Sequence, residues 1–232
     1  MGVILSRDAF FKKRVKIMDI WRQYRDIDPG EQFVVGCDPG TGERNYSCAQ
    51  FLSRTRLDVP IVYHTKEMAV QMTNDIQPVL EKIFDVTKYK AMVAYERGNG
   101  GMFEMGRLAG LNREGKYDIF EMPMLGKREE SDTKKLGWET SSATRPKMLA
   151  DLKDAIDGQL FNVYDKPTIE EMFSFIITQR GQLYKAKAEK GALDDTVMAL
   201  AIAWQLHILL PMQTQNPATG TQFQRRRKTA RT

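Results

Sequence analysis

The sequence predicts an α/β domain in which a mixed β-sheet is flanked by helices. Three strand-like runs joined by short connections come first, as in a β-meander, at residues 32–37, 46–52 and 60–64. Segments with helical spacing then alternate with strand-like runs, and the last patterned segment is an apolar helix. This order of elements is typical of helices packed on a mixed sheet.

Each element follows from its own pattern. Residues 6–25 are predicted to form a helix, because several apolar side chains broadly share one side. Residues 67–84 have helical spacing with a proline that should kink the helix, whereas residues 91–95 are a continuous apolar run typical of a strand buried on both faces. The other expected elements are helices at 99–111, 144–156 and from 167, strands at 117–122, 176–178 and 183–186, a polar surface loop at 127–142, and a final helix from 194 or 195 to 210.

Length, charge and cysteine content limit the class of protein. The 232 residues suffice for one domain with tails: we expect an N-terminal helix and connecting segment at 1–30, the folded domain at 31–210 and a disordered basic tail at 211–232. The net charge of +5 weakly indicates a polyanionic partner. No apolar run approaches the ~20 residues that span a bilayer, so no membrane partner is expected. Cys37 and Cys48 cannot form a disulfide scaffold or a four-ligand zinc site, and both are predicted to be buried.

Acidic residues follow two of the apolar strands and begin the last helix. Asp38 ends the first strand, Glu96 follows the run at 91–95, and Asp194 and Asp195 stand where the final helix starts. If the two strands are neighbours, Asp38 and Glu96 lie side by side at the sheet edge where α/β proteins form ligand sites. The final helix, packed on the same sheet, can bring the aspartate pair to that place.

Clustered carboxylates predict a site for a hard divalent cation. Such groups repel one another, and Mg²⁺ or Mn²⁺ resolves the repulsion because these ions prefer oxygen ligands. Two ions about 3.5–4 Å apart would activate a water and stabilise the leaving oxygen at a phosphodiester. Two of these positions have alternative explanations. Asp38 precedes Pro39 and Gly40 and could be a turn residue, and Asp194 or Asp195 could be the N-cap of the last helix. Glu96 is harder to explain in this way, because a carboxylate directly after a buried strand is costly without a partner.

Basic residues near these motifs are candidates for gripping DNA phosphates without reading bases. They are Arg97, Lys134, Lys135, Arg145, Lys147, Lys185, Lys187 and Lys190. A solvated charged face is the alternative interpretation for each of them. The glycines at 98, 100 and 101 are expected to allow close backbone approach or a tight helix start.

The acidic motifs, in this order, resemble the nuclease domain of tailed-phage terminase large subunits, a branch of the RNase H-like nucleases. The most characteristic stretch is 173–205, where two strands and a glycine turn lead into Asp194-Asp195-Thr196-Val197-Met198-Ala199-Leu200-Ala201, similar to the family's Asp-Asp-x-x-Met-Ala-Leu-Ala helix. Residues 96–101 resemble its second acidic motif, and residues 137–146 resemble the segment before its next helix. The likeness covers about residues 31–210 and rests on the order of the motifs.

The resemblance implies an RNase H-like fold with a catalytic C-terminal helix. It implies a metal-dependent endonuclease that cuts concatemeric viral DNA during packaging with little sequence specificity. Asp38 would bridge two metal ions, Glu96 would bind one, and Asp195 with Asp194 beside it would complete the shell of the other; which of the pair dominates stays open. The implied partners are double-stranded DNA, a terminase ATPase domain, the small terminase subunit and the portal, in the host cell cytoplasm.

Two departures from the family's pattern matter. Many relatives carry a histidine just before the aspartate pair, and here that residue is Leu193, so carboxylates and water must hold the metal. No Gly-x-x-x-x-Gly-Lys-Ser/Thr loop is present. Packaging ATPase activity is therefore not expected of this chain, which is expected to correspond to the nuclease domain.

Three other functions stay open. A Holliday-junction resolvase or a transposase shares the acidic constellation, and a resolvase would prefer four-way junctions to linear duplex. An actin-like or sugar-kinase-type ATPase has a phosphate-binding turn similar to residues 38–42, although that fold needs two such domains. A module that holds DNA or docks to a portal without catalysis would fail to bind Mn²⁺.

Overall fold

The main element of the structure is an eight-stranded mixed sheet. The computed structural model of the chain describes residues 3–4, 20–42, 45–122, 135–173, 175–180, 183–188 and 194–214. The strand order is β1-β2-β5-β4-β3-β6-β7, and β10 also pairs with β5. The strands are β1 Val3–Ile4, β2 Trp21–Gln23, β3 Phe33–Asp38, β4 Ser47–Ser53, β5 Asp58–Thr65, β6 Ala91–Tyr95, β7 Tyr117–Ile119 and β10 Asn162–Val163.

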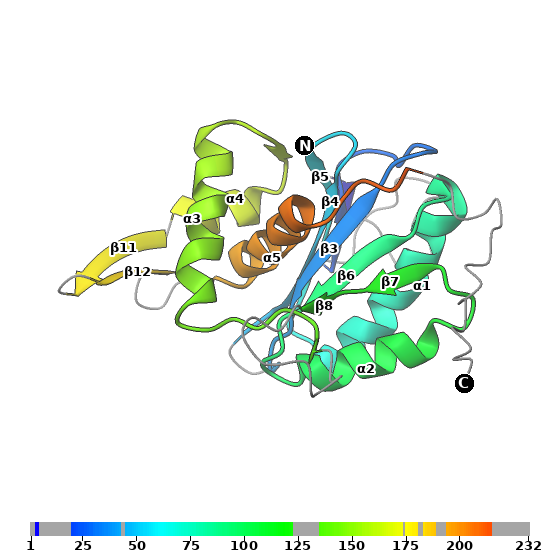
Figure 1. Cartoon of the computed structure of the whole chain (residues 1–232), viewed down its shortest axis with the longest axis horizontal. Coiled ribbons are helices and arrows are strands. Elements are labelled where there is room, and N and C mark those ends of the chain that lie inside the picture. The colour runs from blue at the N-terminus through cyan, green and yellow to red at the C-terminus, as the bar shows by residue number, and fades with distance from the viewer. Residues whose placement is uncertain are drawn as a thin grey trace, which may run out of the picture.

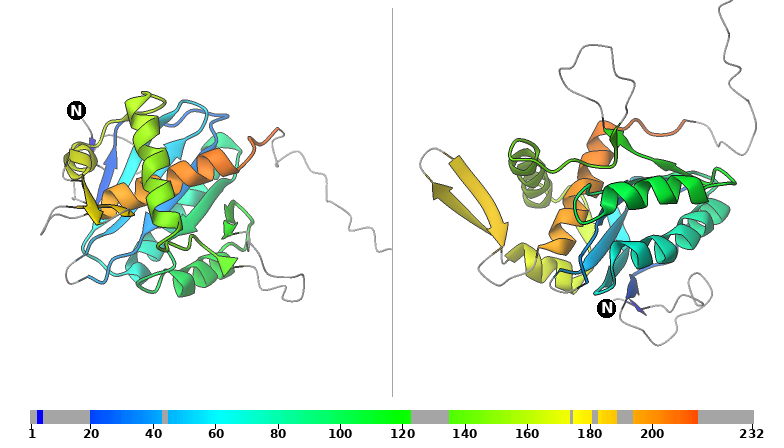
Figure 2. Two further views of the ribbon diagram at one scale, coloured as in Figure 1. Left: turned by 60° about the vertical axis from the view of Figure 1, so that its left-hand side comes forward. Right: turned by 90° about the horizontal axis from the view of Figure 1, so that it is seen from below.

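Helices cover both faces of this sheet. They are α1 Ala69–Thr87, α2 Gly101–Leu111, α3 Thr144–Asp157, α4 Lys166–Phe173 and α5 Asp195–Leu209. Figure 1 shows α1 and α2 on one side of the sheet and α3, α4 and α5 on the other. Two small sheets join β8 (Glu121–Met122) to β9 (Lys135–Leu136) and β11 (Phe175–Arg180) to β12 (Leu183–Ala188). The β11–β12 hairpin projects from the body (Figure 2).

The strand directions confirm the predicted meander and define the edge where the acidic residues lie. β3, β4 and β5 pair antiparallel. β6 pairs with the other side of β3 in parallel, with Cys37 opposite Tyr95. A parallel pair needs a crossover connection, and α1 is the helix in it. β3 and β6 therefore end at the same edge of the sheet.

Strand side chains alternate between two apolar cores, one on each face. Val35 and Val93 belong to the core that contains the buried residues of α1 and α2. Val34 and Ala94 belong to the core that contains those of α3 and α5. Cys37 and Cys48 are free and buried, as predicted.

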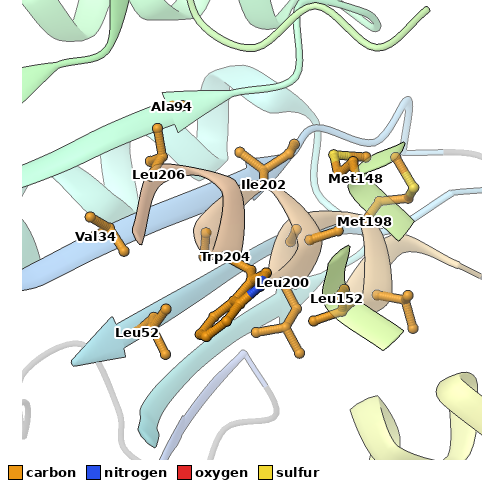
Figure 3. Packing of buried hydrophobic residues seen from close by; sticks show 14 of the residues in the cluster. Val34, Leu52, Ala94, Met148, Leu152, Met198, Leu200, Ile202, Trp204 and Leu206 are labelled. Atoms are coloured by element: carbon orange, nitrogen blue, oxygen red, sulfur yellow. The ribbon is translucent and has the colours of Figure 1, made fainter. Parts of the chain in front are cut away.

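Helix α5 packs against the middle of the sheet almost without a gap. Every residue from Asp195 to Leu206 is buried. A Cβ at Gly36 of β3 would lie 2.1 Å from the carbonyl oxygen of Ala199 and 2.3 Å from the backbone nitrogen of Ala203. Glycine on the strand and alanines on the helix are what allow this approach. Figure 3 shows side chains of α5 among those of the sheet and of α3, including Val34, Leu52, Met148 and Leu152.

The helix predicted at 6–25 is wrong at its C-terminal end. Residues 21–23 form β2, which pairs antiparallel with β5, and all three side chains are buried. Apolar spacing indicated a helix, but the edge of β5 offers unpaired backbone groups that a strand satisfies. Residues 5–19 lie outside the described residues, and the division of the chain at residue 30 stays a prediction.

Two further expectations need correction. Residues 135–138 are not a surface loop, because Lys135–Leu136 form β9 and Trp138 is 4% exposed. Residues 211–214 are not a free tail, because Gln213 is bound to Gln32. The backbone N–H of Gln213 donates to Oε1 of Gln32 at 2.8 Å, and Nε2 of Gln32 donates to the backbone carbonyl of Gln213 at 2.7 Å. Residues 215–232 lie outside the described residues. Within the described ranges, no helix is long and apolar enough to cross a membrane.

Candidate active site

Two carboxylates lie at the ends of the neighbouring parallel strands. β3 ends at Asp38, and Glu96 directly follows β6, with its backbone N–H donating a 2.7 Å hydrogen bond to the carbonyl of Cys37. Because side chains alternate along a strand, Asp38 faces the same side as Gly36, and Glu96 the same side as Ala94. That is the side on which α5 packs. The predicted adjacency of the two strands is confirmed.

The aspartate pair stands at the start of α5, which packs on the face of the sheet where Asp38 and Glu96 lie. Asp195 is only 4% exposed, and its Oδ2 accepts a 3.0 Å hydrogen bond from the backbone N–H of Tyr46, which precedes β4. The carboxylate of Asp194 instead accepts a 2.6 Å hydrogen bond from Arg145 of α3. Successive helical positions are turned by about 100°. The adjacent aspartates therefore have different partners.

The pKa values show that these carboxylates influence one another. Burial, the charge of Glu96 and a hydrogen bond shared with it raise the pKa of Asp38 well above its usual value. The charges of Asp195 and Asp194 act in the same direction. Burial raises the pKa of Asp195 to about 6, and the charge of Glu171 adds to this. The pKa of Asp38 is thus sensitive to the charges of the other three predicted acidic residues, and the catalytic role of all four stays a prediction.

The donors of this acidic pocket, defined by Asp38, Glu96, Asp194 and Asp195, suit a hard divalent cation in their chemistry. All are carboxylate oxygens, and the mutual repulsion that raises the pKa of Asp38 is what such a cation would relieve. As placed, no three His, Cys, Asp or Glu side chains of the described residues form a group that could hold an ion. The fit to a metal therefore rests on charge and donor type.

Glu96 is held by backbone contacts on several sides. The segment after β9 returns beside β6, so that Glu96 forms a parallel bridge with Trp138. The backbone N–H of Trp138 donates to Tyr95 at 2.8 Å, and that of Arg97 donates to the carbonyl of Trp138 at 2.9 Å. The sequence analysis included Trp138 in the segment that resembles the family but placed it in a surface loop, because most of the surrounding residues are polar; a tryptophan in a polar segment was the available signal that it is buried.

Helix α2 starts tightly against the backbone of Glu96. A Cβ at Gly101 would lie 1.9 Å from the carbonyl oxygen of Glu96 and 3.0 Å from Cγ of Pro39. Gly100 precedes the helix with a φ of +85°, a conformation that favours glycine. The expectation of close backbone approach and a tight helix start is confirmed at these two glycines, whereas a Cβ at Gly98 would meet nothing within 4 Å.

The predicted DNA-binding residues differ in how they are paired. Arg145 pairs with Asp194, Lys147 with Asp151 at 2.5 Å, and Lys135 with Glu139 at 3.0 Å. Arg97 forms no ion pair with a described residue; its Nη2 donates to Sδ of Met102 at 3.1 Å, and its Nη1 is buried without a hydrogen-bond partner. Lys185 and Lys187 lie on β12, whose side chains are outside the description, as are Lys134 and Lys190.

Sequence reasoning also missed Glu171 of α4. Its Oε2 accepts hydrogen bonds from the backbone N–H (2.9 Å) and the hydroxyl (2.5 Å) of Thr196, in the first turn of α5. Burial raises the pKa of Glu171, and the charge of Asp194 acts in the same direction. The available signal was a pair of adjacent glutamates on the short helix that precedes the β11–β12 hairpin and the acidic motif.

The fold and the acidic pocket define a class: RNase H-like α/β proteins with carboxylates at the ends of two parallel strands and at the start of a C-terminal helix. Solved structures that are similar to this chain include nuclease domains of large terminases. The nuclease of the large terminase from thermophilic phage G20c, with bound magnesium, has a TM-score of 0.58 at 17% identity and covers 88% of this chain and 97% of its own.

Two other solved structures agree. The Thermus phage P74-26 large terminase nuclease domain has a TM-score of 0.59 at 16% identity, covering 82% of this chain and 86% of that one. The Mn-soaked human cytomegalovirus terminase nuclease domain has a TM-score of 0.50 at 13% identity, covering 88% and 95%. No protein-family model and no curated protein matches the sequence. The predicted fold is confirmed, and at such low identity the function must be argued from the site.

Proposed function

We propose that the protein is a divalent-metal-dependent DNA endonuclease that cuts viral DNA during genome packaging. The observation that carries this proposal is that Asp38 and Glu96 stand at the ends of the neighbouring parallel strands β3 and β6, and that Asp195 begins the helix packed on these strands. The terminase nuclease fold supports it, because the solved relatives place nuclease activity on the same architecture.

Asp38, Glu96 and Asp195 would hold Mg²⁺ or Mn²⁺, and two ions are expected. When bound, such ions supply an activated water and stabilise charge at the scissile phosphate. The chain's own contribution is to keep the carboxylates in place. The sheet holds Asp38 and Glu96, and the Tyr46 N–H holds Asp195.

We assign Arg97 the role of binding a phosphate of the DNA strand that is cut. It follows Glu96 directly, it has no carboxylate partner among the described residues, and one of its buried nitrogens lacks an acceptor. A guanidinium in this state suits a phosphate oxygen, which supplies both charge and acceptor. Contacts to phosphates carry no sequence information, which agrees with cleavage of little sequence specificity.

The likeness to terminases supports double-stranded DNA as the substrate and the host cell cytoplasm as the place of action. A terminase ATPase domain, the small terminase subunit and the portal are the partners we propose on the same basis. A resolvase-like activity would instead show preference for four-way junctions, and an ATPase would hydrolyse nucleotide without DNA.

The test is cleavage of supercoiled plasmid by the full chain with Mn²⁺, Mg²⁺ or EDTA. We expect nicking and degradation with either ion, more with Mn²⁺ because it tolerates imperfect ligand geometry, and none with EDTA. Asp38→Ala and Glu96→Ala should each abolish cleavage with the fold retained by circular dichroism. The matched control is Asp26→Ala, an exposed acid remote from the acidic pocket. Undiminished cleavage by either pocket variant would falsify the assignment.

A further inference from the structure

We propose that Glu171 is a positioning residue that caps the first turn of α5 from a neighbouring helix and thereby holds Asp195 in the acidic pocket. The inference rests on the proposed nuclease function, since Asp195 matters there as a metal ligand. Glu171 belongs to α4, and no part of the catalytic role proposed above is assigned to it.

The first observation is that α5 lacks a cap of its own. The first backbone N–H groups of a helix have no partner within the helix and need an acceptor. Asp194 occupies the N-cap position of α5, yet its side chain makes no capping hydrogen bond, because its carboxylate is bound to Arg145. Oε2 of Glu171 accepts from the N–H of Thr196 instead. A carboxylate there is also favourable to the helix dipole.

The second observation is that three successive residues are each held by a different element. Asp194 is held by α3 through Arg145, Asp195 by the Tyr46 N–H before β4, and Thr196 by α4 through Glu171. Of the two aspartates, Asp195 is the buried one, with 4% of it exposed, and it begins the helix that packs on the face of the sheet where β3 ends in Asp38. The contacts on either side of Asp195 therefore define the rotation of the helix start that places it.

The third observation links this cap to the sheet. The side chain of Gln50 of β4 donates to the carbonyl of Thr196 at 3.3 Å and to Oγ1 of Thr168 of α4 at 2.9 Å. The hydroxyl of Thr168 donates in turn to Asp165, just before α4, at 2.6 Å. α4 and the start of α5 are thus joined through one buried side chain of the sheet. A movement of Glu171 would be transmitted to Asp195, and displacements near 1 Å can cost about 100-fold in rate.

The experiment compares Glu171→Ala and Glu171→Gln with Glu170→Ala in the full chain. Glu170 is the matched control, because it is adjacent, exposed and paired only with Lys166 at 3.4 Å. Three quantities are measured: plasmid cleavage as kcat and KM, Mn²⁺ affinity by calorimetry, and hydrogen exchange of residues 195–198.

We expect Glu171→Ala to lower kcat by about 10–100-fold with little change in KM and to weaken Mn²⁺ binding by about tenfold. Hydrogen exchange at the start of α5 should rise, and Glu170→Ala should match the wild type. Glu171→Gln keeps an oxygen acceptor for the N–H and should recover most of the activity. Wild-type kcat in Glu171→Ala, or a folded Glu171→Gln as impaired as Glu171→Ala, overturns the proposal.

If Glu171→Ala does not fold, Glu171→Asp provides the second measure, because its shorter side chain withdraws the carboxylate from the backbone N–H of Thr196. A several-fold fall in kcat together with faster exchange of residues 195–198 supports the cap, and wild-type kcat and exchange overturn it. Failure of the proposed function looks different: the wild type itself would then show no metal-dependent cleavage. In that case the exchange of residues 195–198 still reports whether Glu171 caps α5.

Discussion

Arg145 Nη2 lies 2.6 Å from Oδ2 of Asp194, and this ion pair separates the roles of two adjacent aspartates. Asp194 is turned toward α3, and 34% of its side chain is exposed. Asp195 is 4% exposed and bound to the Tyr46 N–H, and its charge affects the pKa of Asp38 more than the charge of Asp194 does. Asp195 is therefore the member of the pair that we expect to be the principal ligand.

The difference between the two aspartates can be measured directly. Asp195→Asn removes a buried carboxylate from the acidic pocket and should lower kcat by about 100–1000-fold, since a bound metal is worth several kcal/mol to the transition state. Asp194→Asn leaves that carboxylate in place and should cost about tenfold or less. Plasmid cleavage with Mn²⁺ gives both numbers. The reverse order of effects would show that Asp194 is the principal ligand.

The close contact between β3 and α5 predicts that a methyl group added at Gly36 lowers the stability of the fold. In Gly36→Ala the new Cβ meets backbone atoms of Ala199 and Ala203, which cannot move aside, so the free energy of unfolding should fall by about 3 kcal/mol. Gly106→Ala is the same chemical change inside α2, where a Cβ meets nothing within 4 Å. That control should gain about 0.5–1 kcal/mol. Urea denaturation of both variants checks this, and equal stabilities would contradict the packing argument.

Asp165 predicts a loss of stability in acid. It is fully buried, and it accepts hydrogen bonds from Arg22 and, at 2.6 Å, from the hydroxyl of Tyr24. Burial by itself would raise the pKa of Asp165, but the hydrogen bonds and the charge of Arg22 hold it below the usual value. Asp165→Asn should therefore lower the free energy of unfolding by about 3 kcal/mol at pH 7.

The sign of the pH effect follows from this lowered pKa. The stabilisation is complete above the pKa of an unfolded aspartate, about 3.9, and is lost as the pH falls through the lower pKa of the folded state. The stability gap between wild type and Asp165→Asn should thus stay constant from pH 6 to about pH 4 and narrow as the pH falls from about 4 to 3 in urea denaturation. Asp157→Asn, at an exposed position, serves as the control. A gap that stays constant over this range would refute the charged pair as its cause.

Arg97 predicts a change in the salt dependence of DNA binding. Removing one phosphate contact lowers the number of released counterions, so Arg97→Ala should reduce the slope of log affinity against log salt by about 0.9. Lys82→Ala removes the same charge from an exposed position on α1 and should leave the slope unchanged. Fluorescence anisotropy with duplex DNA and EDTA measures both. Identical slopes for the two variants would remove Arg97 from the phosphate contacts.

Local pattern predicts most of the central fold correctly. The meander, the buried strand β6, the helices α1 to α5 and the hairpin β11–β12 all lie near their expected positions. Period-2 and period-3.6 patterns are written in consecutive residues, so they can be read without knowing the fold. The same reasoning failed at Trp21, because the strand β2 is selected by its partner β5 and not by its own sequence. It also failed at Trp138, whose backbone pairs with the distant residue Glu96.

The sequence by itself determined that carboxylates follow two apolar strands and begin the last helix, because strand ends and helix starts are local features. Only the tertiary structure decided that Asp195 is buried against the backbone N–H of Tyr46 while Asp194 pairs with Arg145, and that Glu171 accepts from the first turn of α5. These choices depend on contacts between residues that are 25 to 149 positions apart. Such contacts exist only once α3 and α4 have packed beside α5, because packing sets which neighbour each polar group meets.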